Sequence, residues 1–83
     1  MNEFSESIRK RIASRFAIDT AELTDGTELF SSGLIDSLGV MDLVALVEQE
    51  LGQPVEPTDI VLDNFDTIAS ITAYAQRVLE GQR

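Results

Sequence analysis

The residues best placed to do chemistry lie in the run LIDSLG at residues 34–39, where a glycine-containing loop gives way to an apolar-periodic, acidic segment. A serine hydroxyl in such a place is either a catalytic nucleophile or the acceptor of a covalent group. Nucleophilic catalysis needs an activating base, and this segment holds neither histidine nor lysine. Gly33 and Gly39 also lack the spacing around Ser37 that a hydrolase nucleophile elbow requires. The pattern therefore favours Ser37 as an acceptor.

Either of two neighbouring residues, Asp36 or Ser37, could be the N-cap of the helix that follows. Serine at a helix start is ordinarily an N-cap, but Asp36 is the better candidate here, which puts Ser37 at the first helical position. Its hydroxyl then points into solvent. A phosphodiester on Ser37 would meet the unpaired N–H groups and the positive end of the helix dipole. The position therefore suits an anionic adduct, while a purely structural role for Ser37 stays open at this point.

The charge of the chain is strongly acidic and unevenly distributed. The formal net charge is −9, and four of the six cations lie within residues 9–15. Between Phe16 and Arg77 there are twelve acids and no base: Asp19, Glu22, Asp25, Glu28, Asp36, Asp42, Glu48, Glu50, Glu56, Asp59, Asp63 and Asp66. Such a surface repels nucleic acid and anionic membranes and attracts basic patches on proteins. The alternative is that the acids merely keep a small domain soluble.

Length and composition exclude several classes of protein. The 83 residues allow a single small domain, residues 1–83. The absence of cysteine excludes disulfides and thiolate metal sites, and histidine, the commonest metal ligand, is also absent. We expect no bound metal. Residues 1–11 are polar and charged, unlike a secretory signal, and no apolar run approaches the roughly 20 residues that cross a bilayer. We therefore expect a monomeric cytoplasmic protein with no membrane insertion.

The first third of the chain predicts one helix and one long loop. An apolar residue recurs every four positions, which predicts an amphipathic helix from Glu3 to Phe16, with Glu6 and Lys10 as a favourable pair. Residues 17–36 show no sustained period and contain two glycine turn signals, so they predict a loop. We expect five apolar residues to anchor this loop in the core: Leu23, Leu29, Phe30, Leu34 and Ile35.

The remainder predicts two long helices with a short one between them. The second helix should run from Ser37 to Leu51, before Gly52, and bury the stripe Val40, Leu43, Val44, Val47 and Leu51. A short helical turn is predicted from Pro57 to Leu62. The last helix should begin after Asp66 as N-cap, end at Gly81 and bury Ile68, Ile71, Ala75, Val78 and Leu79. Three long helices and one short helix predict an all-α fold, a small helical bundle.

The frame around the serine carries a family resemblance. It comprises Leu29, Phe30, Gly33, Leu34, Ile35, Asp36, Ser37 and Leu38. This frame, together with the helix order, resembles the acyl and peptidyl carrier proteins over nearly the whole chain. The resemblance implies that Ser37 carries a 4′-phosphopantetheine arm, whose thiol holds acyl or aminoacyl groups as thioesters. It also implies that Asp36 helps a phosphopantetheinyl transferase to bind coenzyme A. The chain would then be a substrate of partner enzymes and not itself an enzyme.

Within that family, the residues around Ser37 look most like discrete, stand-alone carriers. Fatty-acid carriers more often have an acid where Gly39 stands, and the Gly-Gly-[His/Asp]-Ser pattern of peptidyl carrier domains is absent. The resemblance favours polyketide or other specialised-metabolite biosynthesis over fatty-acid synthesis, with a D-alanyl or other aminoacyl carrier as an alternative. It implies a loading enzyme and a downstream synthase or transferase as partners. The cargo itself stays open.

We expect these partners to bind the exposed flank of the second helix. Asp42 and Ala45 continue from Leu38 at helical spacing, on the side away from the buried stripe. The predicted partner surface comprises Leu38, Met41, Asp42, Ala45, Glu48 and Gln49, bordered by Ile60 and Val61 of the short helix. Its charges would set the encounter rate, and its apolar residues would set the lifetime of the complex.

A second hypothesis belongs to another functional class. An unmodified acidic helical adaptor could bind a basic partner through the second helix, with Ser37 serving only at the helix start. This hypothesis predicts that Ser37→Ala leaves the activity intact. A small enzyme is a third hypothesis, weakened by the absence of any suitable base.

Overall fold

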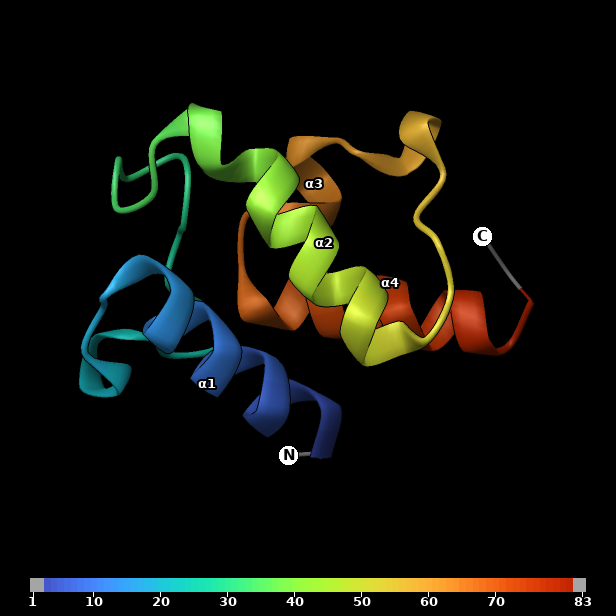
Figure 1. Ribbon diagram of the computed structural model, residues 1–83, viewed down its shortest axis with the longest axis horizontal. Helices are drawn as coiled ribbons and strands as arrows, with labels where there is room; N and C mark the ends of the chain where they lie inside the picture. Colours follow the sequence, from blue (N-terminus) through green and yellow to red (C-terminus); the bar gives the residue numbers. More distant parts are fainter. Residues whose placement is uncertain (1–2, 82–83) are drawn as a thin grey trace.

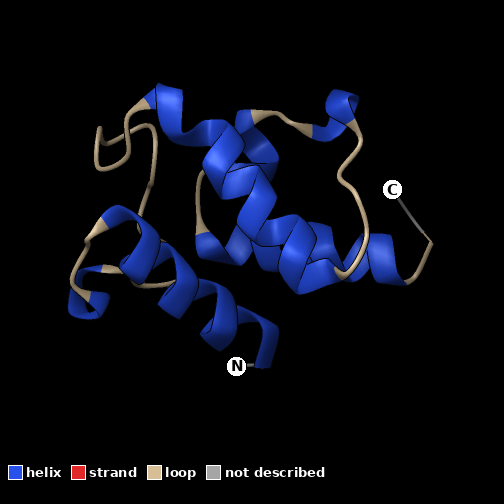
Figure 2. Ribbon diagram, viewed as in Figure 1, coloured by secondary structure: helices blue, strands red, loops and turns tan. Residues whose placement is uncertain are grey.

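The computed structural model describes residues 3–81, and within them it contains helices and loops but no strand (Figures 1 and 2). The order is α1 (Glu3–Phe16), η1 (Thr20–Glu22), η2 (Ser37–Gly39), α2 (Val40–Leu51), η3 (Pro57–Asp59), α3 (Leu62–Phe65) and α4 (Ile68–Leu79), where η denotes a 3-10 helix. Helix α1 packs against both α2 and α4, and α3 packs against α4. The predicted all-α bundle is confirmed. No helix in the described part of the chain is long and apolar enough to cross a membrane.

Helix α1 has the bounds that its four-residue period predicts. Ile8 and Ile12 are fully buried, and Phe4 and Phe16 pack at the edge of the core. The predicted ion pair of Glu6 with Lys10 is not formed. Glu6 instead pairs with Arg9, and the hydrogen bond from Arg9 lowers the pKa of the Glu6 carboxyl. The helix ends at Phe16. The next residue, Ala17, has a φ of +56°, and the Ile18 N–H donates to the Ala13 carbonyl at 2.9 Å.

The long connection, residues 17–36, is anchored as expected, with one exception. Leu23, Leu29 and Ile35 are buried and Phe30 packs against the core. Leu34 is 36% exposed, so its predicted anchoring role is wrong. The Ile35 N–H bonds to the Leu29 carbonyl at 2.8 Å, which closes a turn whose tip carries Leu34 outward.

Asp66 fixes this connection instead of capping the last helix. Its carboxylate accepts the backbone N–H groups of Phe30 at 2.8 Å and Ser31 at 3.0 Å, while its carbonyl accepts the Leu29 N–H at 2.6 Å. The prediction of Asp66 as N-cap is therefore wrong. Thr67 caps α4, because it has the extended backbone that a cap needs and its hydroxyl accepts the Ser70 N–H at 3.0 Å.

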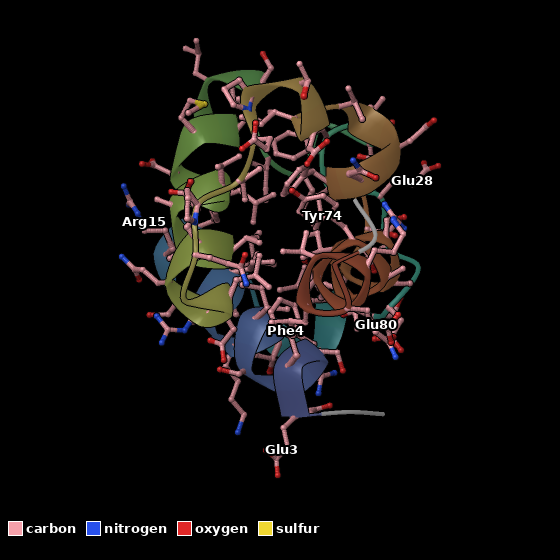
Figure 3. All side chains as sticks on the ribbon, turned by 90° about the vertical axis from the view of Figure 1, so that its right-hand side faces the viewer. Glu3, Phe4, Arg15, Glu28, Tyr74 and Glu80 are labelled. Atoms are coloured by element: carbon pink, nitrogen blue, oxygen red, sulfur yellow. The ribbon has the colours of Figure 1, made fainter. Side chains whose placement is uncertain are left out.

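The core lies between α1, α2 and α4. Leu43, Val44, Val47 and Leu51 are buried as predicted, whereas Val40 is only half-buried. Gly52, with φ +76°, ends α2 in the left-handed conformation that its type predicts. On α4, Leu79 is 62% exposed, so its predicted inward position is wrong; Tyr74 is buried instead. Figure 3 shows Tyr74 pointing into the interior, while Arg15 lies at the outer edge beside α2.

The segment between α2 and α4 is more broken than predicted. The single short helix from Pro57 to Leu62 is replaced by η3 and α3, and residues 60 and 61 lie between them. Val61 has φ −131° and ψ 156°, so its backbone is extended. Helix α4 ends at Leu79, two residues before the predicted end at Gly81.

Candidate functional site

Ser37 is the first residue of η2 and is exposed. Asp36 is its N-cap, as predicted: its φ is −63° and ψ 144°, and its carboxylate accepts the Leu38 N–H at 2.8 Å. The Ser37 hydroxyl makes no hydrogen bond within residues 3–81. Because the capping role is taken by Asp36, this hydroxyl is free to react.

Gly39 is required by packing behind the serine. A Cβ on Gly39 would lie 3.0 Å from Cε1 of Phe16 and 3.1 Å from Cγ2 of Ile35. The Gly39 N–H bonds to the Asp36 carbonyl at 2.8 Å, which tightens the first turn into a 3-10 helix. The contact of η2 with the end of α1 and with Ile35 therefore explains why a glycine stands at this position.

The electrostatics at the helix start differ from the simple expectation. The Leu38 N–H is already used by the Asp36 carboxylate, so fewer N–H groups are open to an added anion than a bare helix start offers. Asp36 is exposed and forms no ion pair in the described part of the chain. A phosphodiester on Ser37 would therefore lie beside a carboxylate that has no cation paired with it, and both would face the solvent.

An apolar pocket adjoins Ser37. It has a volume of about 200 Å³ and is lined by Phe30, Ser37, Val40, Ile60, Val61, Leu62 and Phe65. Ser37 supplies the single polar side chain of this lining. Val40 is only half-buried because it faces this pocket rather than the core. Sequence analysis did not predict the pocket, because its walls come from three separate segments.

Exposed apolar residues surround this part of the molecule. Leu38 is 89% exposed and Met41 60% exposed, and both follow Ser37 along the chain. Val61 and Leu62, also exposed, belong to the pocket lining. Of these four, sequence analysis included all but Leu62, which it placed at the end of the short helix with no role. Large apolar side chains held in solvent indicate a contact surface.

The polar residues of the predicted partner surface have contacts within the chain. Asp42 pairs with Arg15 at 2.8 Å, and Gln49 accepts a hydrogen bond from Arg11 at 3.2 Å. The Glu48 carboxylate accepts the backbone N–H of Val55 at 2.8 Å. Ala45 is exposed on the same helix. The surface is therefore less strongly anionic than its sequence predicts.

Comparison with known proteins gives a consistent result. Residues 6–75 match the family model described as the phosphopantetheine attachment site. Over 60 residues, 72% of this chain, the sequence is 43% identical to the lincomycin biosynthesis protein LmbN of Streptomyces lincolnensis, and the match spans 22% of that protein. Over 77 residues, 93% of both chains, it is 27% identical to the acyl carrier protein of Thermotoga maritima.

Proposed function

Because this chain belongs to the carrier proteins with a phosphopantetheine attachment site, we propose that Ser37 is the residue to which 4′-phosphopantetheine is joined. The predicted family, carrier role and cofactor are thereby confirmed, since the matched residues cover most of the chain. When bound, the group supplies a terminal thiol that holds acyl or aminoacyl cargo as a thioester. Members of this family are acted upon by enzymes and do not themselves catalyse the reactions of their cargo.

One observation carries the assignment of Ser37. Its hydroxyl is exposed and without a hydrogen bond in the described residues, and it is also the one polar group in the lining of an apolar pocket. A group attached at Ser37 therefore has solvent on one side and a place for apolar atoms on the other. The other serines near it lack this combination: Ser32 donates to the Glu28 carbonyl, and neither Ser31 nor Ser32 lines the pocket.

The attachment reaction assigns a role to each residue of the turn. Oγ of Ser37 attacks the phosphorus of coenzyme A that bears the pantetheine moiety, and a new P–O bond forms. The pyrophosphate P–O bond breaks, adenosine 3′,5′-bisphosphate leaves, and the serine proton passes to a base of the transferase. The chain offers no such base, so the transferase supplies it. Asp36 holds the turn through one carboxylate oxygen, which accepts the Leu38 N–H, and its exposed carboxylate would also help the transferase to bind coenzyme A.

The pocket and the relatives favour an acyl cargo of modest size. An apolar cavity of about 150 Å³ can hold a benzene-sized molecule, so the volume near Ser37 suits a small ring or a short branched chain. The identity to a lincomycin biosynthesis protein supports a role in specialised metabolism over fatty-acid synthesis. An aminoacyl cargo that stays in solvent is the second candidate, since the exposed setting of Ser37 accepts it equally.

The partners of this carrier act at the surface around Ser37. They are a phosphopantetheinyl transferase, an enzyme that loads the cargo and one that consumes it, all in the cytoplasm. Leu38 and Met41 supply apolar contact, with Ala45, Ile60 and Val61 beside them. Asp42, Glu48 and Gln49 have internal partners, so these polar residues contribute less than the predicted surface implies. Weak, mainly apolar contact suits a carrier that must release each enzyme.

The test is modification by a broad-specificity phosphopantetheinyl transferase with coenzyme A, followed by intact mass. Wild type and Ser14→Ala, which removes another exposed serine hydroxyl, should each gain one phosphopantetheinyl group. Ser37→Ala should gain none. A wild-type chain that gains nothing would favour the unmodified adaptor, and a gain by Ser37→Ala would assign the group to another residue.

A further inference from the structure

We propose that Tyr74 and Asp59, which lie outside the lining of the pocket, form a latch that sets its width and so selects the cargo. The inference rests on the proposed attachment at Ser37, because the pocket matters only to cargo held there. The latch is a pair of positioning residues: neither side chain lines the pocket, and each acts through a neighbour that does.

The first half of the latch is a hydrogen bond from the core to the pocket wall. Tyr74 on α4 is 2% exposed, and its hydroxyl donates to Oδ2 of Asp59 at 2.8 Å. Asp59 ends η3 and directly precedes Ile60 and Val61, two residues of the pocket lining. Ile60 and Val61 form one wall of the pocket, and the position of this wall is therefore linked to the buried side chain of Tyr74.

The second half of the latch acts on another residue of the lining, Phe65. The ring of Tyr74 lies 5.5 Å from the ring of Phe65, centroid to centroid, with 51° between their planes. Phe65 is 1% exposed and lines the pocket. Tyr74 thus contacts Phe65 directly and holds Ile60 and Val61 through Asp59. Its position determines the space between them.

A small polar cluster, formed by Asn64 and Arg77, holds Tyr74 and Asp59 in position relative to each other. The Asn64 side chain donates to the Asp59 carbonyl at 2.9 Å, and Arg77 donates to the Asn64 side-chain oxygen at 3.0 Å. The Arg77 guanidinium also lies 5.7 Å from the centroid of the Tyr74 ring. These contacts join η3, α3 and α4.

Few buried side chains hold this wall in place, and Ile60 is only partly buried where it packs against the core. Within residues 52–61, Val55 alone is buried, and Ile60 and Val61 lie between two short helices. Their backbone contacts are local turns, such as the Val61 N–H to the Asp59 carbonyl at 2.9 Å. Loss of the Tyr74 hydroxyl should therefore let Ile60 and Val61 move outward and admit a wider group, without unfolding the bundle.

The test compares cargo of two widths. The transferase loads benzoyl or naphthoyl groups from the corresponding acyl-coenzyme A, and the rate of thioester hydrolysis in mild base measures how well each is sheltered. In wild type the benzoyl thioester should hydrolyse more slowly than the naphthoyl thioester, so that the ratio of the naphthoyl rate to the benzoyl rate exceeds one. Tyr74→Phe keeps the contact with Phe65 and should reduce this ratio by about fivefold, the effect of one lost hydrogen bond. Asp59→Ala removes the acceptor of the same hydrogen bond and should reduce the ratio similarly.

Two control variants separate the loss of the Tyr74–Asp59 hydrogen bond from the loss of a negative charge. Asp59→Asn keeps an oxygen that can accept from Tyr74 and should retain the wild-type ratio, as should Asp63→Asn, which removes an exposed acid nearby. Methyl NMR signals of Ile60 and Val61 should shift in Tyr74→Phe and Asp59→Ala. If these variants are modified normally but keep the wild-type ratio, the latch is rejected and the attachment at Ser37 stands. If no variant and no wild type is modified, the proposed function fails instead.

Discussion

The two connections on either side of α2 both reach the pocket beside Ser37, but they are held in different ways. The long connection, residues 17–36, buries Leu23, Leu29 and Ile35, and its backbone bonds to the start of α4 and to Asp66. The short connection, residues 52–61, buries Val55 alone, and its hydrogen bonds include those with Glu48, Asn64 and Tyr74. One side of the site is therefore fixed and the other is adjustable.

This difference matches what a carrier must do at its attachment point. The fixed side holds Asp36 and Ser37 in one geometry, because Ile35 is buried directly before them and Gly39 packs on Phe16 directly after. Every transferase then meets the same turn. The adjustable side carries Ile60 and Val61, which line the pocket beside Ser37.

The largest expected difference between the two connections comes from truncating their apolar residues. Leu29→Ala removes a fully buried side chain and should lower the free energy of unfolding by about 2–5 kcal/mol. Val61→Ala removes one that is 48% exposed and should change it by less than about 0.5 kcal/mol. Urea denaturation followed by circular dichroism measures both. Equal losses would contradict the division into a fixed and an adjustable side.

A smaller difference should follow from removing the carboxylate that each connection uses. Asp66→Ala leaves two backbone N–H groups without their acceptor and should cost about 2 kcal/mol. Glu48→Ala leaves only the Val55 N–H and should cost about 1 kcal/mol. The rate of Ser37 modification should fall for Asp66→Ala and stay near that of wild type for Glu48→Ala. The reverse order in both measurements would show that the short connection is the firmer one.

The smallest expected effect is a pH dependence of the stability that Asp66 gives to the long connection. Partial burial alone would raise the pKa of Asp66, but hydrogen bonds from Ser31 and from the Phe30 N–H outweigh it and lower this pKa. The stabilisation is complete above the ordinary aspartate pKa of about 4 and is lost as the pH falls through the lowered value. The difference in unfolding free energy between wild type and Asp66→Ala should therefore narrow in acid. A difference that widens below pH 4 would contradict the assignment.

Local patterns predicted the parts of this molecule that depend on neighbouring residues. The four-residue apolar period defined α1, Asp36 was identified as a cap from its type, and Gly52 marked the end of α2. Asp66 and Thr67 are both acceptable caps by type. Contact with the distant Phe30 N–H decides between them, and no local pattern reports such a contact.

The place of Ser37 at a helix start could be predicted from the sequence, and its surroundings could not. Ser37 lies in a contiguous motif, whereas its pocket combines Phe30 with Val40 and Phe65, which are far apart in the sequence. Tyr74 carried a signal that sequence analysis did not use: it lies three residues after Ile71 and four before Val78, on the buried stripe of α4. Its hydrogen bond to Asp59 could not be inferred, because that depends on how η3 folds back against α4.

The central claim is that Ser37 carries the phosphopantetheine group, and the most direct test locates the added mass in the intact wild-type chain. After modification by the transferase, the protein is fragmented along its backbone in the mass spectrometer. The account predicts that amino-terminal fragments ending before residue 37 have their unmodified mass and that every fragment containing Ser37 carries one group. Added mass within residues 1–36, which include Ser31 and Ser32, would contradict it.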